Sequence, residues 1–321
     1  MKRVLVAGSS GEIGSALTAA MLQRPGIELV AGIDLRPPGV RLPHFHFTRA
    51  DIAQPCPDLL RSLAIDTVVH AAYTLQPTHR PRTRTRTATA GTQAILASAQ
   101  AAGVRTFLHL SSATVYGARP GNPALLPESA PLQPNPRFPY ATDKLAAEST
   151  LRDFLRQFPG AFSSVLILRP CFVLGRGTAN AFMRHLCRAM VPLPAAQASM
   201  QFIHRDDLVE IVLRLLEMEV SGTYNVAAPG ALTPATMVQL LGGYPLLIPD
   251  TLLTLAHRLA WSAHLPIAPA PAAFLDLLRF PWRVDCSALG RVLPRPFRHT
   301  TPETFQLFVE DRLLSKRSSK R

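Results

Sequence analysis

The sequence predicts an α/β protein built on an open, doubly wound parallel sheet, followed by a smaller and irregular lobe. In the first half, short apolar runs rich in β-branched residues alternate with segments of helical periodicity, a pattern typical of parallel strands connected by helices. After about residue 169 this alternation stops and prolines cluster. The 321 residues, 47% hydrophobic and 17% charged, are sufficient for a large core and exclude an intrinsically disordered protein.

Six apolar runs, each followed by turn residues, are the predicted strands, and four segments between them have helical spacing. The strands are expected at residues 3–7, 28–34, 44–48, 67–70, 106–111 and 164–169. The helices are expected at residues 12–23, 57–63, 88–102 and 141–156. Because strands and helices alternate, the sheet should be covered on both faces.

The second half is predicted to form a substrate-binding lobe over residues 171–314, interleaved with the first domain (1–170) around residues 200–228. Prolines at 192–194, 229–234, 245–249 and 266–271 interrupt its periodicity. The final segment, 315–321, is basic and is expected to be a disordered tail.

Charge and cysteine usage favour a cytoplasmic protein without nucleic-acid partners. The formal charge is +13, but only four of the 34 basic residues are lysines and the arginines are scattered rather than grouped in a stripe. The four cysteines lie far apart, which predicts reduced thiols. No apolar run of eighteen residues is present, so no membrane span is expected. His44 and His46 have no ligand partners at suitable spacing, so no metal site is expected.

A glycine-rich turn follows the first predicted strand and predicts a dinucleotide site in a Rossmann-type domain. Gly8, Gly11 and Gly14 stand at three-residue spacing where the strand meets a helix. Glycine permits close approach to a pyrophosphate, and the N–H groups of the helix N-terminus attract its charge. Asp34, twenty residues after Gly14, ends the second strand, where a carboxylate binds an adenosine ribose. Arg36 could accept the 2′-phosphate of NADP, so NAD is favoured and NADP is left open.

Tyr140 and Lys144 are the candidate acid–base pair. They stand four residues apart at the start of a predicted helix, which places both side chains on one face. A neighbouring ammonium is expected to lower the pKa of the phenol by favouring the phenolate.

The chain resembles the extended short-chain dehydrogenase/reductases, the NAD-dependent epimerase/dehydratase family, over roughly residues 3 to 230. The resemblance depends on GSSGEIG (8–14), Asp34, Asp51 with Ile52, DTVVHAA (66–72), Gly91 with Thr92, SSATVYG (111–117), YATDK (140–144) with Glu148, RPCFVLG (169–175), IHRDDL (203–208) and YNV (224–226).

The resemblance implies that Tyr140 is the general acid–base, that Lys144 lowers its pKa and holds the nicotinamide ribose, and that Ser112 orients the reacting oxygen. It also implies cofactor contacts at Gly8, Ser10, Gly11, Glu12, Ile13, Gly14, Asp34, Arg36, Asp51, Ile52, Ala71, Ala72, Lys144 and Pro170.

Two departures bear on the substrate. Ala88 stands where the family usually has an asparagine near the active site, and Phe172 stands where its nucleotide-sugar members have another. The apolar C-terminal region resembles the 3β-hydroxysteroid dehydrogenase-like and ketone-reductase branch, which implies a bulky apolar substrate; the alternative for its leucines at 252, 255 and 259 is plain lobe core.

Three functions therefore stay open. The favoured one is an NAD(P)-dependent oxidoreductase acting on a secondary alcohol or ketone. A nucleotide-sugar 4-epimerase or dehydratase with tightly bound NAD is the second, and a non-catalytic dinucleotide sensor is the third. The arginines of the 80–86 run are expected in a solvated loop, with the grip of an acidic substrate as the alternative. The predicted helices at 88–102 and 141–156 resemble the family's dimer-forming pair, which implies a possible homodimer.

Overall fold

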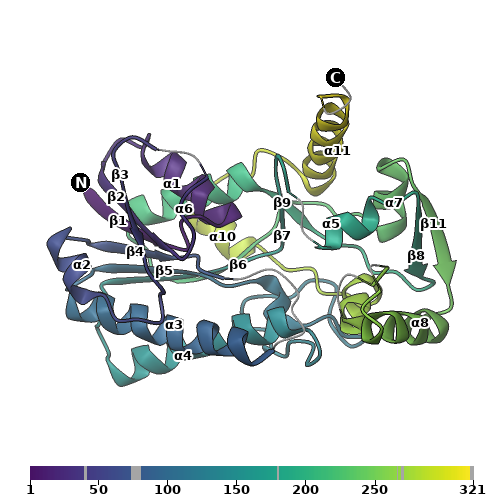
Figure 1. Cartoon of the computed structure of the whole chain (residues 1–321), viewed down its shortest axis with the longest axis horizontal. Coiled ribbons are helices and arrows are strands. Elements are labelled where there is room, and N and C mark those ends of the chain that lie inside the picture. The colour runs from purple at the N-terminus through teal and green to yellow at the C-terminus, as the bar shows by residue number, and fades with distance from the viewer. Residues whose placement is uncertain (40–41, 74–80, 179–180, 266, 269–270, 319–321) are drawn as a thin grey trace.

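A seven-stranded parallel sheet forms the centre of the molecule in this computed structural model, which describes residues 1–39, 42–73, 81–178, 181–265, 267–268 and 271–318 (Figure 1). The strand order is β10-β6-β5-β4-β1-β2-β3. The strands are β1 (Lys2–Ala7), β2 (Ile27–Asp34), β3 (Phe45–Arg49), β4 (Thr67–His70), β5 (Thr106–Leu110), β6 (Ser164–Pro170) and β10 (Gly222–Val226). The doubly wound fold and all six predicted strands are confirmed, and β10 adds a seventh that was not predicted as a strand.

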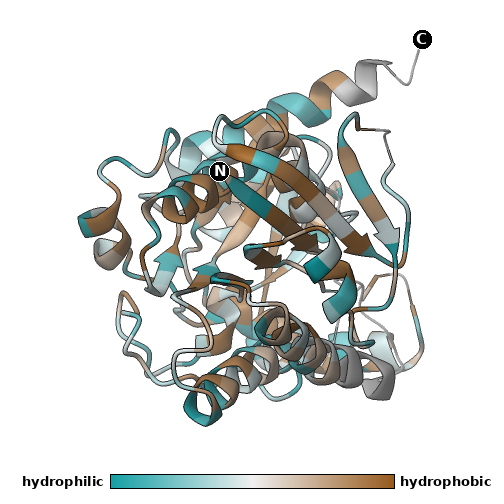
Figure 2. Ribbon diagram, turned by 90° about the vertical axis from the view of Figure 1, so that its left-hand side faces the viewer, coloured by the Kyte–Doolittle hydropathy of each residue, from teal (hydrophilic) through white to brown (hydrophobic). Residues whose placement is uncertain are grey.

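Helices cover both faces of the sheet, as its alternating residues require. On β1, Val4 and Val6 belong to one apolar cluster, whereas Leu5 and Ala7 belong to the other. Helices α1 (Glu12–Met21) and α6 (Arg205–Met218) pack on the first face. Helices α2 (Pro57–Ser62), α3 (Pro81–Ala101) and α4 (Pro139–Gln157) cover the second, below the sheet in Figure 1. Figure 2 shows apolar residues, in brown, along the strands between these layers.

Most boundaries agree with the prediction to within two residues, and two of the differences have a clear local cause. β3 begins after His44, whose φ of 61° is left-handed and interrupts the extended backbone. α3 begins at Pro81 rather than at Ala88, since proline suits the first helical turn. The solvated loop expected from the sequence for the arginine run at 80–86 is therefore wrong for residues 81–86, whose backbone is helical. Arg80 and the side chains of Arg82, Arg84 and Arg86 lie outside the described residues.

The second half adds two small parallel sheets. Strands β7 (Phe172–Leu174) and β9 (Phe202–His204) pair, and so do β8 (Met190–Pro194) and β11 (Tyr244–Ile248). The remaining helices are η1 (Ala113–Tyr116), α5 (Ala181–Leu186), α7 (Pro234–Leu240), α8 (Asp250–Ser262), η2 (Ala272–Leu275), α9 (Asp276–Arg279), α10 (Ser287–Val292) and α11 (Thr301–Ser318). None of the helices in the described part of the chain is long and apolar enough to cross a membrane.

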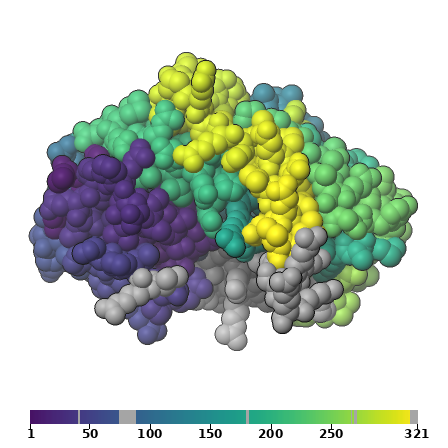
Figure 3. Space-filling model, turned by 90° about the horizontal axis from the view of Figure 1, so that it is seen from above, coloured from purple at the N-terminus to yellow at the C-terminus, as the bar shows by residue number. Residues whose placement is uncertain are grey.

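The C-terminal segments lie across the junction between the two halves. In Figure 3 the yellow C-terminal chain lies between the purple and teal part of the surface and the green part. α6 and β10 belong to the layers of the large sheet, and the division of the chain at residue 170 stays a prediction. The expected basic tail starts at residue 315, whereas α11 continues to Ser318 and residues 319–321 lie outside the described part.

Candidate active site

The glycine turn between β1 and α1 is packed too tightly for any other residue at two positions. Gly8 has a φ of 87°, and a Cβ there would lie 2.5 Å from the Cα of Ala72. A Cβ on Gly14 would lie 2.0 Å from the carbonyl oxygen of Gly8. The N-cap of α1 is Gly11, which offers no side-chain cap. The first-turn N–H groups of this helix are therefore suited to an anion such as a pyrophosphate.

Asp34 is fixed beside this turn by backbone hydrogen bonds. Its carboxylate accepts from the N–H of Ser10 at 3.1 Å and from the N–H of Arg36 at 3.0 Å. The Ser10 hydroxyl donates to the Arg36 carbonyl oxygen at 2.7 Å. The structure thus brings Ser10 to Asp34 and Arg36, which lie more than twenty positions later in the sequence; all three are predicted cofactor residues.

One cavity joins the glycine turn to the predicted catalytic residues. It is lined by Gly11, Glu12, Ile13, Gly14, Ala71, Ser112, Tyr140, Lys144 and Pro170 among others. The other predicted cofactor residues, Gly8, Ser10, Asp34, Arg36, Asp51, Ile52 and Ala72, are not in its lining. Of these, Asp51 accepts a hydrogen bond from the N–H of Ala53 at 3.0 Å, and Ile52 packs close to Gly91.

Ser112, Tyr140 and Lys144 meet at the C-terminal end of β5. Ser112 is the N-cap of η1, and the N–H of Thr114 donates to its hydroxyl at 3.2 Å. Tyr140 and Lys144 come from the start of α4, and a side-chain hydrogen bond joins Tyr140 to Ser112. The ammonium of Lys144 donates to the Leu110 carbonyl oxygen at 2.7 Å. All three predicted catalytic side chains therefore face one place.

Burial dominates the titration of this pair. Burial raises the pKa of Tyr140, and the hydrogen bond to Ser112 opposes that rise. The expected net lowering of the pKa of Tyr140 by the ammonium is wrong for this structure, because taking the phenolate out of water raises that pKa. Burial also lowers the pKa of Lys144 to about 8, so at neutral pH the phenol and the ammonium are the main forms.

Sequence reasoning missed Tyr73 and Asp143. The Tyr73 hydroxyl donates to the carboxylate of Asp143 at 3.1 Å. The ring of Tyr73 packs edge-on against Tyr140 with 4.9 Å between centroids, and the ammonium of Lys144 lies 4.9 Å from the Tyr73 centroid. Tyr73 thus supports both catalytic candidates. Its place directly after Ala71 and Ala72, and that of Asp143 within YATDK, were the available signals.

The far wall of the cavity is aromatic. Phe172 stacks on Phe182 with 4.5 Å between centroids and an angle of 6°, and Trp282 packs edge-on against Phe172 at 5.6 Å. Trp261 and Phe274 complete this wall. Phe172, which stands where nucleotide-sugar members of the family have an asparagine, is therefore part of an apolar surface. The catalytic candidates and the glycine turn line the same cavity as this wall.

The other departure, Ala88, is buried in α3 and leaves no room for a free polar group. Its carbonyl oxygen accepts a hydrogen bond from the Thr92 hydroxyl at 2.6 Å, and that hydroxyl is 3.0 Å from Nε2 of His70. The Thr92 hydroxyl thus bonds the helix backbone and one nitrogen of His70, whereas Nδ1 of His70 is buried without a hydrogen-bond partner among the described residues.

Comparisons with known proteins agree with this geometry. The model of the NAD dependent epimerase/dehydratase family matches residues 4–227. GDP-6-deoxy-D-mannose reductase of Pseudomonas aeruginosa is 31% identical over 248 residues, covering 71% of this chain and 75% of the relative. The uncharacterized protein Rv0501 of Mycobacterium tuberculosis is 29% identical over 260 residues, covering 77% of this chain and 68% of the relative.

Solved structures show the same fold. MoeE5 in complex with UDP-glucuronic acid and NAD has a TM-score of 0.74 at 24% identity, covering 98% of this chain and 99% of that one. UDP-glucuronic acid 4-epimerase from Bacillus cereus, in complex with NAD, has a TM-score of 0.73 at 19% identity, covering 97% and 99%. None of these matches supports the predicted 3β-hydroxysteroid dehydrogenase-like branch. The predicted enzyme class and its NAD cofactor are confirmed at the level of the family: this chain belongs to the NAD-dependent epimerase/dehydratase family.

Proposed function

We propose that this protein transfers a hydride between NAD and a secondary alcohol or ketone carbon of a bulky apolar substrate. The observation that carries the proposal is that Ser112, Tyr140 and Lys144 line the same cavity as the glycine turn and the aromatic wall. A cofactor on one side and an apolar substrate on the other would meet at these three polar groups.

The residues at the glycine turn fit a dinucleotide. The uncapped first turn of α1 would receive the pyrophosphate. Asp34 would accept hydrogen bonds from the adenosine ribose, and its charge would repel a 2′-phosphate, which favours NAD over NADP. Asp51 and Ile52 would contact the adenine. The pyrophosphate and nicotinamide side would be lined by Ala71, Ala72 and Pro170. Lys144 would hold the nicotinamide ribose. NAD supplies the hydride chemistry, and the protein supplies orientation and the proton.

The chain's own residues would manage that proton. The phenol of Tyr140 is protonated at neutral pH because burial raises its pKa, so it can donate to a developing alkoxide. The Ser112 hydroxyl, hydrogen-bonded to Tyr140, would orient the reacting oxygen. The ammonium of Lys144 would stabilise the phenolate that remains after the proton has left. These steps favour ketone reduction at neutral pH.

A nucleotide-sugar epimerase or reductase is the second candidate. It is favoured by the similarity to GDP-6-deoxy-D-mannose reductase and to UDP-glucuronic acid decarboxylase 2 of Arabidopsis thaliana, which is 29% identical over 252 residues. The aromatic packing of Phe172 with Phe182 and Trp282 argues against it, because a sugar presents hydroxyl groups that this wall cannot bind. A non-catalytic dinucleotide sensor would need none of Ser112, Tyr140 and Lys144, so the presence of all three argues against this function.

Purified protein should be assayed for NADH oxidation with bicyclic and steroidal ketones and with UDP- and GDP-sugars. Tyr140→Phe should lower kcat by about 10²- to 10⁴-fold, since general acid–base catalysis contributes that much, and should leave NADH binding unchanged. Tyr244→Phe is the matched control, because Tyr244 is exposed and outside the cavity lining. Unchanged turnover in Tyr140→Phe would refute the assignment. If nucleotide sugars raised the Tm and apolar ketones did not, the second candidate would replace the first.

A further inference from the structure

Helix α8 presents its apolar stripe to solvent. Leu252, Leu255 and Leu259 recur at three- and four-residue spacing, so they lie on one face, and they are 58%, 56% and 64% exposed. The opposite side buries Leu253 and His257. A surface helix normally directs its apolar stripe inward. The alternative interpretation, that these leucines form the lobe core, is therefore wrong.

The chain that follows the helix extends the same surface. The N–H of Leu265 donates to the Ala260 carbonyl oxygen at 2.9 Å, which holds it against the last turn of α8. Leu265 is 50% exposed and Ile267 is 55% exposed. We call Leu252, Leu255, Leu259, Leu265 and Ile267 the α8 surface. Exposed apolar groups in such numbers along one segment indicate an interaction site.

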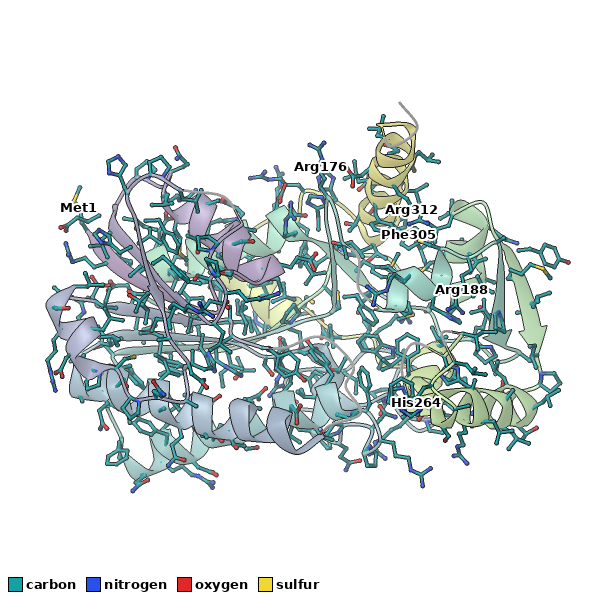
Figure 4. All side chains as sticks on the ribbon, in the orientation of Figure 1. Met1, Arg176, Arg188, His264, Phe305 and Arg312 are labelled. Carbon is teal, nitrogen blue, oxygen red and sulfur yellow. The ribbon has the colours of Figure 1, made fainter. Side chains whose placement is uncertain are left out.

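The α8 surface lies at the end of the molecule that is farthest from β1. Figure 1 shows α8 at the lower right, and Figure 4 labels His264, which follows the helix, opposite Met1. The same segment also supplies Trp261 and Pro271 to the cavity.

Charge decides between the possible occupants. Residues 229–283 contain three arginines, two aspartates, and no lysine or glutamate. Asp250 pairs with Arg279 at 2.9 Å, and Asp276 is half-buried and accepts a hydrogen bond from Asn135 at 3.3 Å. Arg258 is exposed on α8 among the leucines. The charge nearest the leucines is that of Arg258, which interacts with Asp276, and the chain as a whole has a formal charge of +13.

We propose that the α8 surface docks on an anionic phospholipid bilayer. An amphipathic helix with leucines on its exposed side and a flanking arginine lies in the plane of the lipid interface, held by apolar burial and by attraction to anionic headgroups. Two copies of a chain with a formal charge of +13 repel each other, whereas an anionic surface attracts this chain. This docking requires neither turnover nor a particular substrate, so it stands apart from the proposed function.

Vesicle flotation tests the proposal with the full chain. Wild type should float with phosphatidylcholine–phosphatidylserine vesicles and only weakly with phosphatidylcholine alone. Brominated phosphatidylcholine in the anionic vesicles should quench tryptophan fluorescence, since Trp261 is on α8. The Leu252→Gln/Leu255→Gln/Leu259→Gln variant should lose about a hundredfold in vesicle affinity and lose the quenching, because each leucine contributes several-fold through burial. Arg258→Gln should weaken binding to the anionic vesicles alone.

The matched control is Leu125→Gln/Leu307→Gln/Leu313→Gln, which removes three solvent-facing leucines on other surfaces and should float like wild type. Circular dichroism and NADH binding verify that each variant folds. Failure of wild type to float, or equal flotation of the α8 variant and wild type, would overturn the proposal. Sedimentation equilibrium identifies the other occupant: a dimer that the α8 substitutions dissociate, without flotation, would assign this surface to a second copy and likewise overturn bilayer docking.

Discussion

Removing the carboxylate of Glu148 should destabilise the fold strongly, because it leaves a buried guanidinium without its partner. Glu148 on α4 is fully buried and Arg169 on β6 is 1% exposed. Nη2 of Arg169 lies 2.5 Å from Oε1 of Glu148, and Nε donates to Oε2 at 3.2 Å. The Ser111 hydroxyl donates to the same Oε2 at 2.6 Å. This group joins α4, β5 and β6 directly behind the catalytic candidates.

The expected cost of Glu148→Ala is about 3–5 kcal/mol, the usual penalty for breaking a buried ion pair by removing one partner. Arg169 keeps two acceptors, the Tyr116 hydroxyl at 2.5 Å and the Glu128 carbonyl oxygen at 3.0 Å, so the lower end of that range is expected. Against a typical total stability of about 5–15 kcal/mol, this is a large share.

Urea unfolding of wild type and Glu148→Ala, at equal slope, measures the difference. Asp58→Ala is the control: its pair with Arg61 spans 2.9 Å, with the side chains 95% and 52% exposed, and should contribute less than about 1 kcal/mol. Lys144 is one helical turn before Glu148, and Ser111 lines the cavity, so NADH-dependent turnover should fall too. Equal stability losses in the two variants would refute the argument from burial.

Three further results are expected. Gly14→Ala should abolish NADH binding, measured by fluorescence titration, because its Cβ would collide with the carbonyl oxygen of Gly8; retained affinity would contradict the tight turn. Burial lowers the pKa of Lys144 from 10.5 to about 8, so between these two pH values the unfolded chain binds more protons than the folded chain. The free energy of unfolding of wild type should therefore rise by up to about 3 kcal/mol relative to that of Lys144→Met as pH increases. Parallel curves of stability against pH for the two proteins would contradict this prediction. His109 is buried, and neither ring nitrogen has a hydrogen-bond partner among the described residues. Because burial and the neighbouring His70 and Lys144 lower its pKa, His109→Leu should resist unfolding better than wild type as pH falls below about 6.5, the usual pKa of histidine. An identical acid unfolding transition in the variant and wild type would contradict this prediction.

The sequence by itself determined the elements whose signals are local. The predicted strands depend on short apolar runs, the turn at Gly8 and Gly14 on glycine spacing, and the common face of Tyr140 and Lys144 on helical periodicity. Each of these patterns spans only a few residues, so neighbours along the chain suffice to specify it. The dinucleotide site and the acid–base pair were therefore predictable.

The tertiary structure decided what depends on residues far apart in sequence. Packing brought Tyr73 against Tyr140, paired Glu148 with Arg169, and built the aromatic wall from Phe172 and Trp282. It also set the burial that raises the pKa of Tyr140 above the value expected beside an ammonium. Periodicity showed that the α8 leucines share a face, but it could not show whether that face points inward. The face that points inward depends on how the rest of the lobe packs against the helix, and here Leu253 and His257 are on the buried side.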